Sequence, residues 1–137
     1  MEATFPRTLD SLAPLFDFIA GFVARNRIGE ADAYALTLAI EEVFVNVVRY
    51  SAGSTDGVAV SLSRETDTVV VKLTDFGAGS FDLTRVARVD NSLPLAARRP
   101  GGLGIHLARS VMDEIKYQHD SGRSITTLVK RLGATRV

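Results

Sequence analysis

Residues 39–50 read Ala-Ile-Glu-Glu-Val-Phe-Val-Asn-Val-Val-Arg-Tyr, the second half of a helix predicted from about Ala31 to Tyr50. Glu42, Asn46 and Arg49, spaced four and then three residues apart, form a polar stripe on this helix. Either the stripe is functional, or Glu42 and Arg49 are a solvated pair beside an ordinary surface amide. A separate face of the helix is apolar and is expected to supply core: Leu36, Ile40, Val43, Phe44 and Val47.

A second informative segment begins where a predicted strand, Val69-Val-Val-Lys-Leu-Thr, runs into Asp75-Phe-Gly-Ala-Gly79. Glycines at such a position let the backbone turn sharply and come close to a flat ligand. The Asp75 carboxylate could accept a hydrogen bond from an amino group such as the exocyclic amine of adenine. Taken alone, the segment is better interpreted as a plain Asp-Gly turn.

The third segment is Gly101-Gly-Leu-Gly104, at the start of a helix predicted from Leu103 to Ile115. Small residues let successive backbone N–H groups converge on phosphate oxygens, and a helix N-terminus favours an anion. A flexible hinge with a helix cap is the other interpretation. The segment does not open a βαβ unit, and no Gly-Lys-Ser/Thr follows it, so neither the Rossmann nor the Walker motif applies.

The rest of the chain predicts one domain, 1–137, with an α+β two-layer sandwich fold. A mixed, mostly antiparallel sheet of about five strands would be covered on one face by three helices. The stretch 77–102 has no strand pattern, and a connection that long is usually functional or misassigned. The other expected elements are an edge strand Ala3–Arg7, a helix capped by Asp10 or Ser11 that ends near Asn26, a hairpin over Val58–Leu62 and Val69–Leu73, and strands Ile115–His119 and Ser124–Arg131.

The composition of the 137 residues narrows the functional classes. Lysine plus arginine equals aspartate plus glutamate, so the net charge is zero and gives no reason to expect direct nucleic acid binding or a membrane partner. There is no cysteine and hence no disulfide or thiolate metal site. No apolar run approaches the roughly 20 residues that span a bilayer, and no signal peptide is recognisable. A cytoplasmic protein is expected.

The order of the three segments resembles that of the GHKL (Bergerat-fold, histidine-kinase-like) ATPases. The helix corresponds to the N box of that family, and the two glycine segments correspond to its two glycine boxes. Within the family, the chain resembles the anti-sigma-factor serine/threonine-protein kinases from Leu9 to Leu132. The segments that carry this closer resemblance are Ala39–Tyr50, Pro94-Leu, Gly101-Gly-Leu-Gly-Ile-His-Leu-Ala-Arg-Ser-Val-Met-Asp-Glu and the closing Gly122-Arg-Ser and Leu128-Val-Lys-Arg-Leu.

The resemblance implies ATP and Mg²⁺ as cofactors and assigns roles to the polar helix residues and to Asp75. Asn46 would be a ligand of Mg²⁺, an ion that prefers oxygen. Glu42 would be the general base that takes the proton from the incoming hydroxyl. Arg49, one turn beyond Asn46, would approach the phosphates, and Asp75 would bind the adenine amino group.

The remaining implied roles fall on the glycine segments and the stretch between them. Gly77 and Gly79 would shape the adenine pocket beneath a lid over about 80–100. Arg98 and Arg99, at the end of this lid, either neutralise charge on the γ-phosphoryl group or are a solvated pair. The phosphates would be held by five successive residues: Gly101, Gly102, Leu103, Gly104 and Ile105. Two positions depart from the family pattern, since Tyr50 stands where many relatives have histidine and Ser124 where many have asparagine.

The function that the resemblance implies is an ATP-dependent serine kinase that acts as an anti-sigma factor. Such a kinase binds a sigma factor and phosphorylates a serine of an anti-anti-sigma antagonist of the STAS type. One alternative is an ATP-gated binding module without phosphotransfer, which would not need Glu42. Another is a detached catalytic domain of a sensor histidine kinase. A homodimer is also expected from the resemblance, with the N-terminal edge strand as an unpaired surface.

Overall fold

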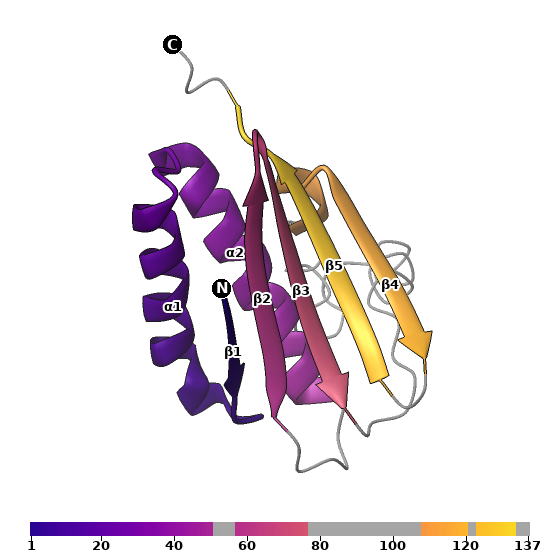
Figure 1. The fold of residues 1–137 in the computed structure, drawn as a ribbon. Helices are drawn as coiled ribbons and strands as arrows, with labels where there is room; N and C mark the ends of the chain where they lie inside the picture. The colour runs from indigo at the N-terminus through magenta and orange to yellow at the C-terminus, as the bar shows by residue number, and fades with distance from the viewer. Residues whose placement is uncertain (51–56, 77–107, 121–122, 134–137) are drawn as a thin grey trace, which may run out of the picture.

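The computed structural model of the chain describes residues 1–50, 57–76, 108–120 and 123–133, and Figure 1 shows their arrangement. Residues 108–111 form a single helical turn, and the earlier residues of the predicted third helix lie outside the described part of the chain. No helix among the described residues is long and apolar enough to cross a membrane. The other elements, in chain order, are β1 (Glu2–Phe5), a 3-10 turn (Leu9–Ser11), α1 (Leu12–Arg25), α2 (Glu30–Tyr50), β2 (Val58–Glu65), β3 (Thr68–Phe76), β4 (Glu114–Asp120) and β5 (Arg123–Arg131).

The five strands form one sheet in the order β1-β2-β3-β5-β4. Each neighbouring pair is antiparallel, so the sheet is wholly antiparallel among the described strands and has no parallel pair there. The N-terminal strand lies at one edge, as the sequence predicts. The prediction of a mostly antiparallel five-stranded sheet is therefore confirmed.

The helices α1 and α2 lie together on one face of the sheet and produce the expected second layer (Figure 1). Along β3 the side chains that face the helices are buried, and those between them are more exposed. The five residues assigned to the apolar face of α2 are all at most 5% exposed. Burying each such side chain contributes about 1.5–3 kcal/mol, so this interface accounts for much of the stability of the fold.

One helix boundary agrees with the prediction and one differs from it. The α1 helix begins at Leu12 with Ser11 at the N-cap position, one of the two predicted, although the Ser11 hydroxyl donates to the Pro6 carbonyl at 2.7 Å and not to the helix. The helix expected to reach Ile115 instead leaves the helical conformation after residue 111. There the backbone N–H of Asp113 donates to the Val129 carbonyl at 2.8 Å, and β4 begins at the next residue.

Candidate nucleotide site

Asn46 is the most informative of the predicted site residues. Its side chain is 0% exposed, and its amide Nδ2 donates to the backbone carbonyl of Glu42 at 2.7 Å. Its carbonyl Oδ1 is buried and has no hydrogen-bond partner within the described residues. An unsatisfied buried acceptor costs about 1–3 kcal/mol, so native proteins rarely keep one without a use. The ordinary-surface-amide interpretation of Asn46 is therefore wrong.

Glu42 lies one turn before Asn46 on α2 and is only partly buried. Burial raises the pKa of the Glu42 carboxyl above its ordinary value, and the adjacent Glu41 carboxylate raises it further. The exposed Arg49 guanidinium opposes this rise in the pKa. A carboxylate whose pKa is raised toward neutrality accepts protons better, which suits a general base.

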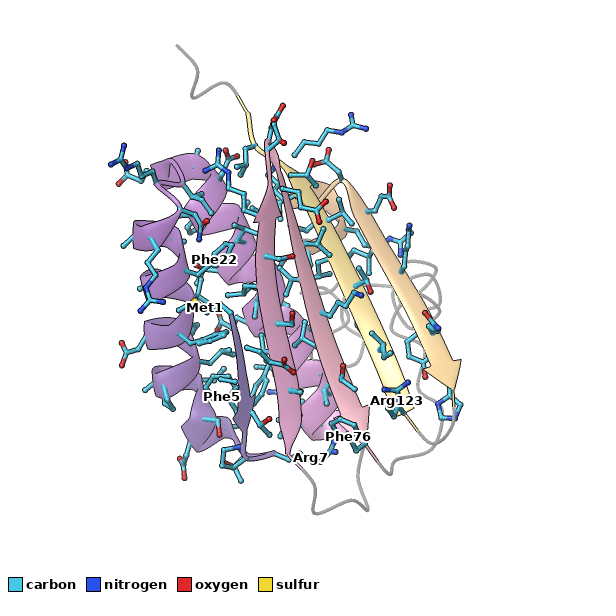
Figure 2. All side chains as sticks on the ribbon, in the orientation of Figure 1. Met1, Phe5, Arg7, Phe22, Phe76 and Arg123 are labelled. Atoms are coloured by element: carbon cyan, nitrogen blue, oxygen red, sulfur yellow. The ribbon has the colours of Figure 1, made fainter. Side chains whose placement is uncertain are left out.

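Asp75 lies at the end of β3 and is 3% exposed. Its Oδ1 forms an ion pair with Nη2 of Arg7, whose side chain is 8% exposed. The same Nη2 donates to the carbonyl of Phe76 at 3.4 Å, and Figure 2 shows Arg7 beside Phe76 at this end of the strand. Asp75 is thus a buried, ion-paired acid within the sheet, and the glycines that follow it lie outside the described residues.

The register of the sheet brings two further polar residues to the surroundings of Asp75. Ser124 on β5 pairs with Asp75, and Thr126 pairs with Leu73. Both are buried, at 6% and 3% exposed, and so lie on the face that the helices cover. Ser124 Oγ accepts a hydrogen bond from the Tyr117 hydroxyl at 3.0 Å. The period-two alternation of β5 already contained the signal that Ser124 and Thr126 share a face, whereas Arg7 stood out in no motif.

The fold brings the polar stripe of α2 and Asp75 to the same end of the molecule. The C-terminal half of α2 and the C-terminal end of β3 lie at that end, with α2 against the sheet (Figure 1). The helix contacts both β3 and β5. Asn46 and Asp75 therefore belong to elements that meet at the same end, and both residues are buried.

The other predicted site residues lie outside the described part of the chain. These are the lid over about 80–100 and the residues Gly77, Gly79, Arg98, Arg99, Gly101, Gly102, Leu103, Gly104 and Ile105. Their proposed contacts remain predictions.

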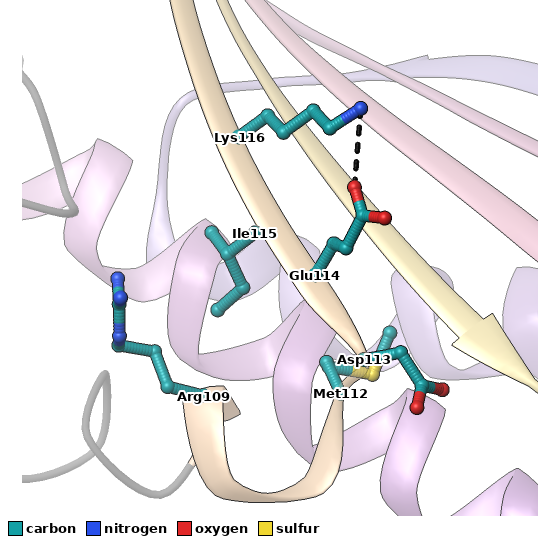
Figure 3. A pocket seen from close by; sticks show the side chains of 6 residues that line it. All are labelled: Arg109, Met112, Asp113, Glu114, Ile115 and Lys116. Carbon is teal, nitrogen blue, oxygen red and sulfur yellow. Dashed lines mark ion pairs between the residues drawn. The ribbon is translucent and has the colours of Figure 1, made fainter.

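Neither of two cavities formed by described residues contains Glu42, Asn46 or Asp75. One, of about 290 Å³, lies beside the start of β4, where an exposed ion pair joins Glu114 and Lys116 at 3.1 Å (Figure 3). The second, of about 410 Å³, is lined mainly by apolar residues of α1 and α2. The described residues also contain no cluster of three or more histidine, cysteine or acidic side chains that could hold a metal ion. Mg²⁺ in nucleotide sites is usually held by one or two protein oxygens together with water and the phosphates, so a single Asn46 oxygen is compatible with such a site.

Known proteins resemble this chain in sequence and in fold. The chain is 30% identical over 136 residues to the serine-protein kinase RsbW of Halalkalibacterium halodurans, covering 89% of this chain and 82% of that protein. It is similar in structure to the RsbU and RsbW domains of a Mycobacterium tuberculosis protein, with a TM-score of 0.69 and 19% identity, covering 96% of this chain and 32% of that chain.

A second solved structure with the same fold is the SiaB-SiaC complex from Pseudomonas aeruginosa. The TM-score is 0.59 at 15% identity, and the match covers 95% of this chain and 88% of that chain. At these identities both solved structures show the fold alone. The model of a family described as the histidine kinase-like ATPase domain matches residues 5–130. The chain therefore belongs to the histidine kinase-like ATPase domain family.

Proposed function

We propose that this protein is an ATP-dependent serine kinase that acts as an anti-sigma factor. The observation that carries the proposal is the buried Asn46 Oδ1, which lacks a partner among the described residues. Asn46 belongs to the C-terminal half of α2, which lies at the same end of the fold as the C-terminal end of β3, where Asp75 is found (Figure 1). The resemblance to a protein named serine-protein kinase supports the reaction.

Four described polar residues of the candidate site have a role in this function. Asp75 accepts a hydrogen bond from the amino group of adenine. Asn46 Oδ1 binds Mg²⁺, which, when bound, neutralises charge on the phosphates of ATP. Glu42 takes the proton from the serine hydroxyl of the protein substrate, and Arg49 draws the phosphates toward α2.

The segments beyond the described residues complete the proposed site. Gly77 and Gly79 shape the base pocket, and residues 101–105 hold the phosphates with backbone N–H groups. Arg98 or Arg99 stabilises charge on the transferred group from the end of the lid over about 80–100.

The proposed partners are a sigma factor and an anti-anti-sigma protein of the STAS type that carries the acceptor serine. The similarity to a chain of the SiaB-SiaC complex, in which a protein with this fold is bound to another protein, is in keeping with a partner protein here. We further propose that the protein acts in the cytoplasm without direct contact to nucleic acid or membrane. The edge strand β1 offers a surface for a homodimer, and light scattering that gives the mass of a monomer at all concentrations would exclude that dimer.

The proposed reaction is tested with a Glu42→Ala variant, radiolabelled ATP and purified candidate antagonists. Loss of a general base lowers the rate by about 10²–10⁴-fold, while ATP binding measured by calorimetry stays near that of the wild type. Glu30→Ala is the matched control, since Glu30 is an exposed carboxylate in the first turn of the same helix. Normal phosphorylation by Glu42→Ala would show that Glu42 is not the base.

The same assay separates the kinase from the binding module. The wild-type protein is a nucleotide-gated binding module if it binds Mg-ATP with micromolar affinity and phosphorylates none of the antagonists whose genes neighbour its own. A wild-type protein that does not bind adenine nucleotide excludes both functions.

A further inference from the structure

The ion pair between Arg7 and Asp75 joins a residue of the N-terminal segment to the proposed base-binding acid, 68 positions away. Both side chains are less than a tenth exposed, so the pair is shielded from water. Removing one partner from such a pair leaves a buried charge uncompensated, which is strongly unfavourable. The position of the Asp75 carboxylate is therefore tied to that of Arg7.

The backbone that carries Arg7 is itself held firmly. The Pro6 carbonyl accepts hydrogen bonds from the Thr8 N–H at 2.8 Å and from the Ser11 hydroxyl at 2.7 Å. On the other side of Pro6, Phe5 pairs with Val58 in the sheet. Arg7 thus reaches Asp75 from a braced turn and not from a loose end.

The direction from which Arg7 reaches Asp75 leaves the proposed base site accessible. Arg7 follows β1, and the strand order places β1 and β2 on one side of β3. On the other side of β3 lies β5, with Ser124 paired with Asp75, and α2 packs over β3 and β5. A base bound between Asp75 and the polar stripe of α2 would therefore lie away from the side that Arg7 occupies.

We propose that Arg7 is a positioning residue, which holds the Asp75 carboxylate in the orientation that accepts the amino group of adenine. This proposal rests on the proposed function, because it assumes that Asp75 binds the base. Arg7 does not touch the nucleotide. Arg7 holds the Asp75 carboxylate in its binding orientation before the nucleotide arrives. Nucleotide binding then does not have to order the carboxylate.

The test compares two ligands in two proteins. The ligands are Mg-ADP and the Mg complex of purine riboside 5′-diphosphate, which lacks the 6-amino group. Dissociation constants are measured by NMR titration, which also reaches millimolar affinities. In the wild type, loss of a hydrogen bond to a charged group should weaken binding by about tenfold or more. In Arg7→Met the ratio of the dissociation constant of the purine riboside ligand to that of Mg-ADP should fall to about two. The reason is that the Asp75 carboxylate is no longer held toward the base.

A merely structural role for Arg7 gives a different pattern. If Arg7→Met only lowers the fraction of folded protein, both ligands weaken equally and the ratio keeps its wild-type value, which overturns the proposal. A ratio that rises above the wild-type value also overturns it, since Arg7 would then compete with the base for Asp75. Thermal unfolding of each variant identifies the temperature at which all samples are folded.

The control is Arg64→Met. The Arg64 side chain is exposed, and its guanidinium donates to the backbone carbonyls of Thr66, at 2.7 Å, and Asn26. It should leave the ratio of the two ligands unchanged. A wild type that binds neither ligand refutes the proposed function itself. A wild-type ratio near one shows that Asp75 does not read the amino group, whereas a high ratio preserved in Arg7→Met refutes only the role of Arg7.

Discussion

Glu42 combines partial burial with two charged neighbours, and the balance of these effects determines how its ionisation is linked to folding. Burial and Glu41 raise the pKa of the Glu42 carboxyl in the folded protein, and Arg49 only partly offsets the rise. The folded state therefore binds a proton at Glu42 more tightly than the unfolded chain does. Between the two pKa values, the free energy of unfolding decreases as pH rises, and above the folded pKa the loss is complete.

The first prediction follows from this sign. Glu42→Gln, which cannot ionise, should unfold at a higher temperature than the wild type near neutral pH without nucleotide. The difference should shrink as pH is lowered below the ordinary pKa of a glutamate, where both side chains are neutral. Thermal unfolding at a series of pH values measures it. Glu65→Gln, at an exposed position of β2, is the control for the effect of the substitution itself, and a gain in Glu42→Gln no larger than in this control would contradict the prediction.

At the scale of single residues, the sequence pointed to some residues of the candidate site and missed others for a clear reason. Glu42 and Asn46 are neighbours on one helix, so their spacing alone placed them together. Asp75 was recognisable because glycines follow it. Arg7 could not be found in this way, since its contact with Asp75 depends on the register of three strands. Local spacing carries no information about that register.

Among the elements, β1 depends on a close approach between two backbones. A Cβ added to Gly57 would lie 2.7 Å from the Phe5 carbonyl oxygen and 2.9 Å from Thr4 Cγ2. Gly57→Ala should therefore displace β1 and destabilise the protein by about 1–3 kcal/mol. Chemical denaturation measures the loss, and faster hydrogen exchange at residues 2–5 locates it.

The matched control is Gly21→Ala in α1. There the nearest atom to an added Cβ is Met1 Cε at 3.6 Å, an ordinary contact. Replacing a glycine inside a helix by alanine should stabilise the protein by up to about 1 kcal/mol. Equal effects of the two substitutions would contradict the assignment of Gly57 as a packing constraint.

The helix that continues into β4 shows why element boundaries were less predictable than element types. A helical period over Leu103, Leu107, Val111 and Met112 predicts a helix that reaches Ile115. In the structure Glu114 already pairs with Val129, so strand pairing overrides the local preference. The strands β3 and β5 were predicted correctly because buried and less buried residues alternate along them. In β2 the apolar residues Val58, Val60 and Leu62 alternate in the sequence, although Ala59 between them is buried as well.

For the whole molecule, the proposed site predicts that ligand binding and folding are coupled through Asn46. With a non-hydrolysable ATP analogue at about 100 times its Kd, linkage adds about 2.7 kcal/mol. For a domain of this size the unfolding temperature should rise by about 10 °C. Asn46→Ala should lose the part of this rise that requires Mg²⁺, as measured by thermal unfolding with magnesium and with EDTA.

A suitable control for this experiment is Asn26→Ala. The Asn26 amide also donates to a carbonyl four residues earlier, that of Phe22 at 2.9 Å, but it lies at the end of α1. Its Mg²⁺-dependent rise should equal that of the wild type. An undiminished rise in Asn46→Ala would exclude the amide as a magnesium ligand.

The buried Asn46 Oδ1 on α2 also implies a trade-off between the stability of the free protein and ligand binding. A leucine at position 46 would fill nearly the same space without an unsatisfied hydrogen-bond acceptor. The nucleotide-free protein would then unfold at a higher temperature. Selection for thermal stability alone would replace Asn46. The presence of Asn46 at this position is therefore explained by ligand binding and not by the stability of the free protein.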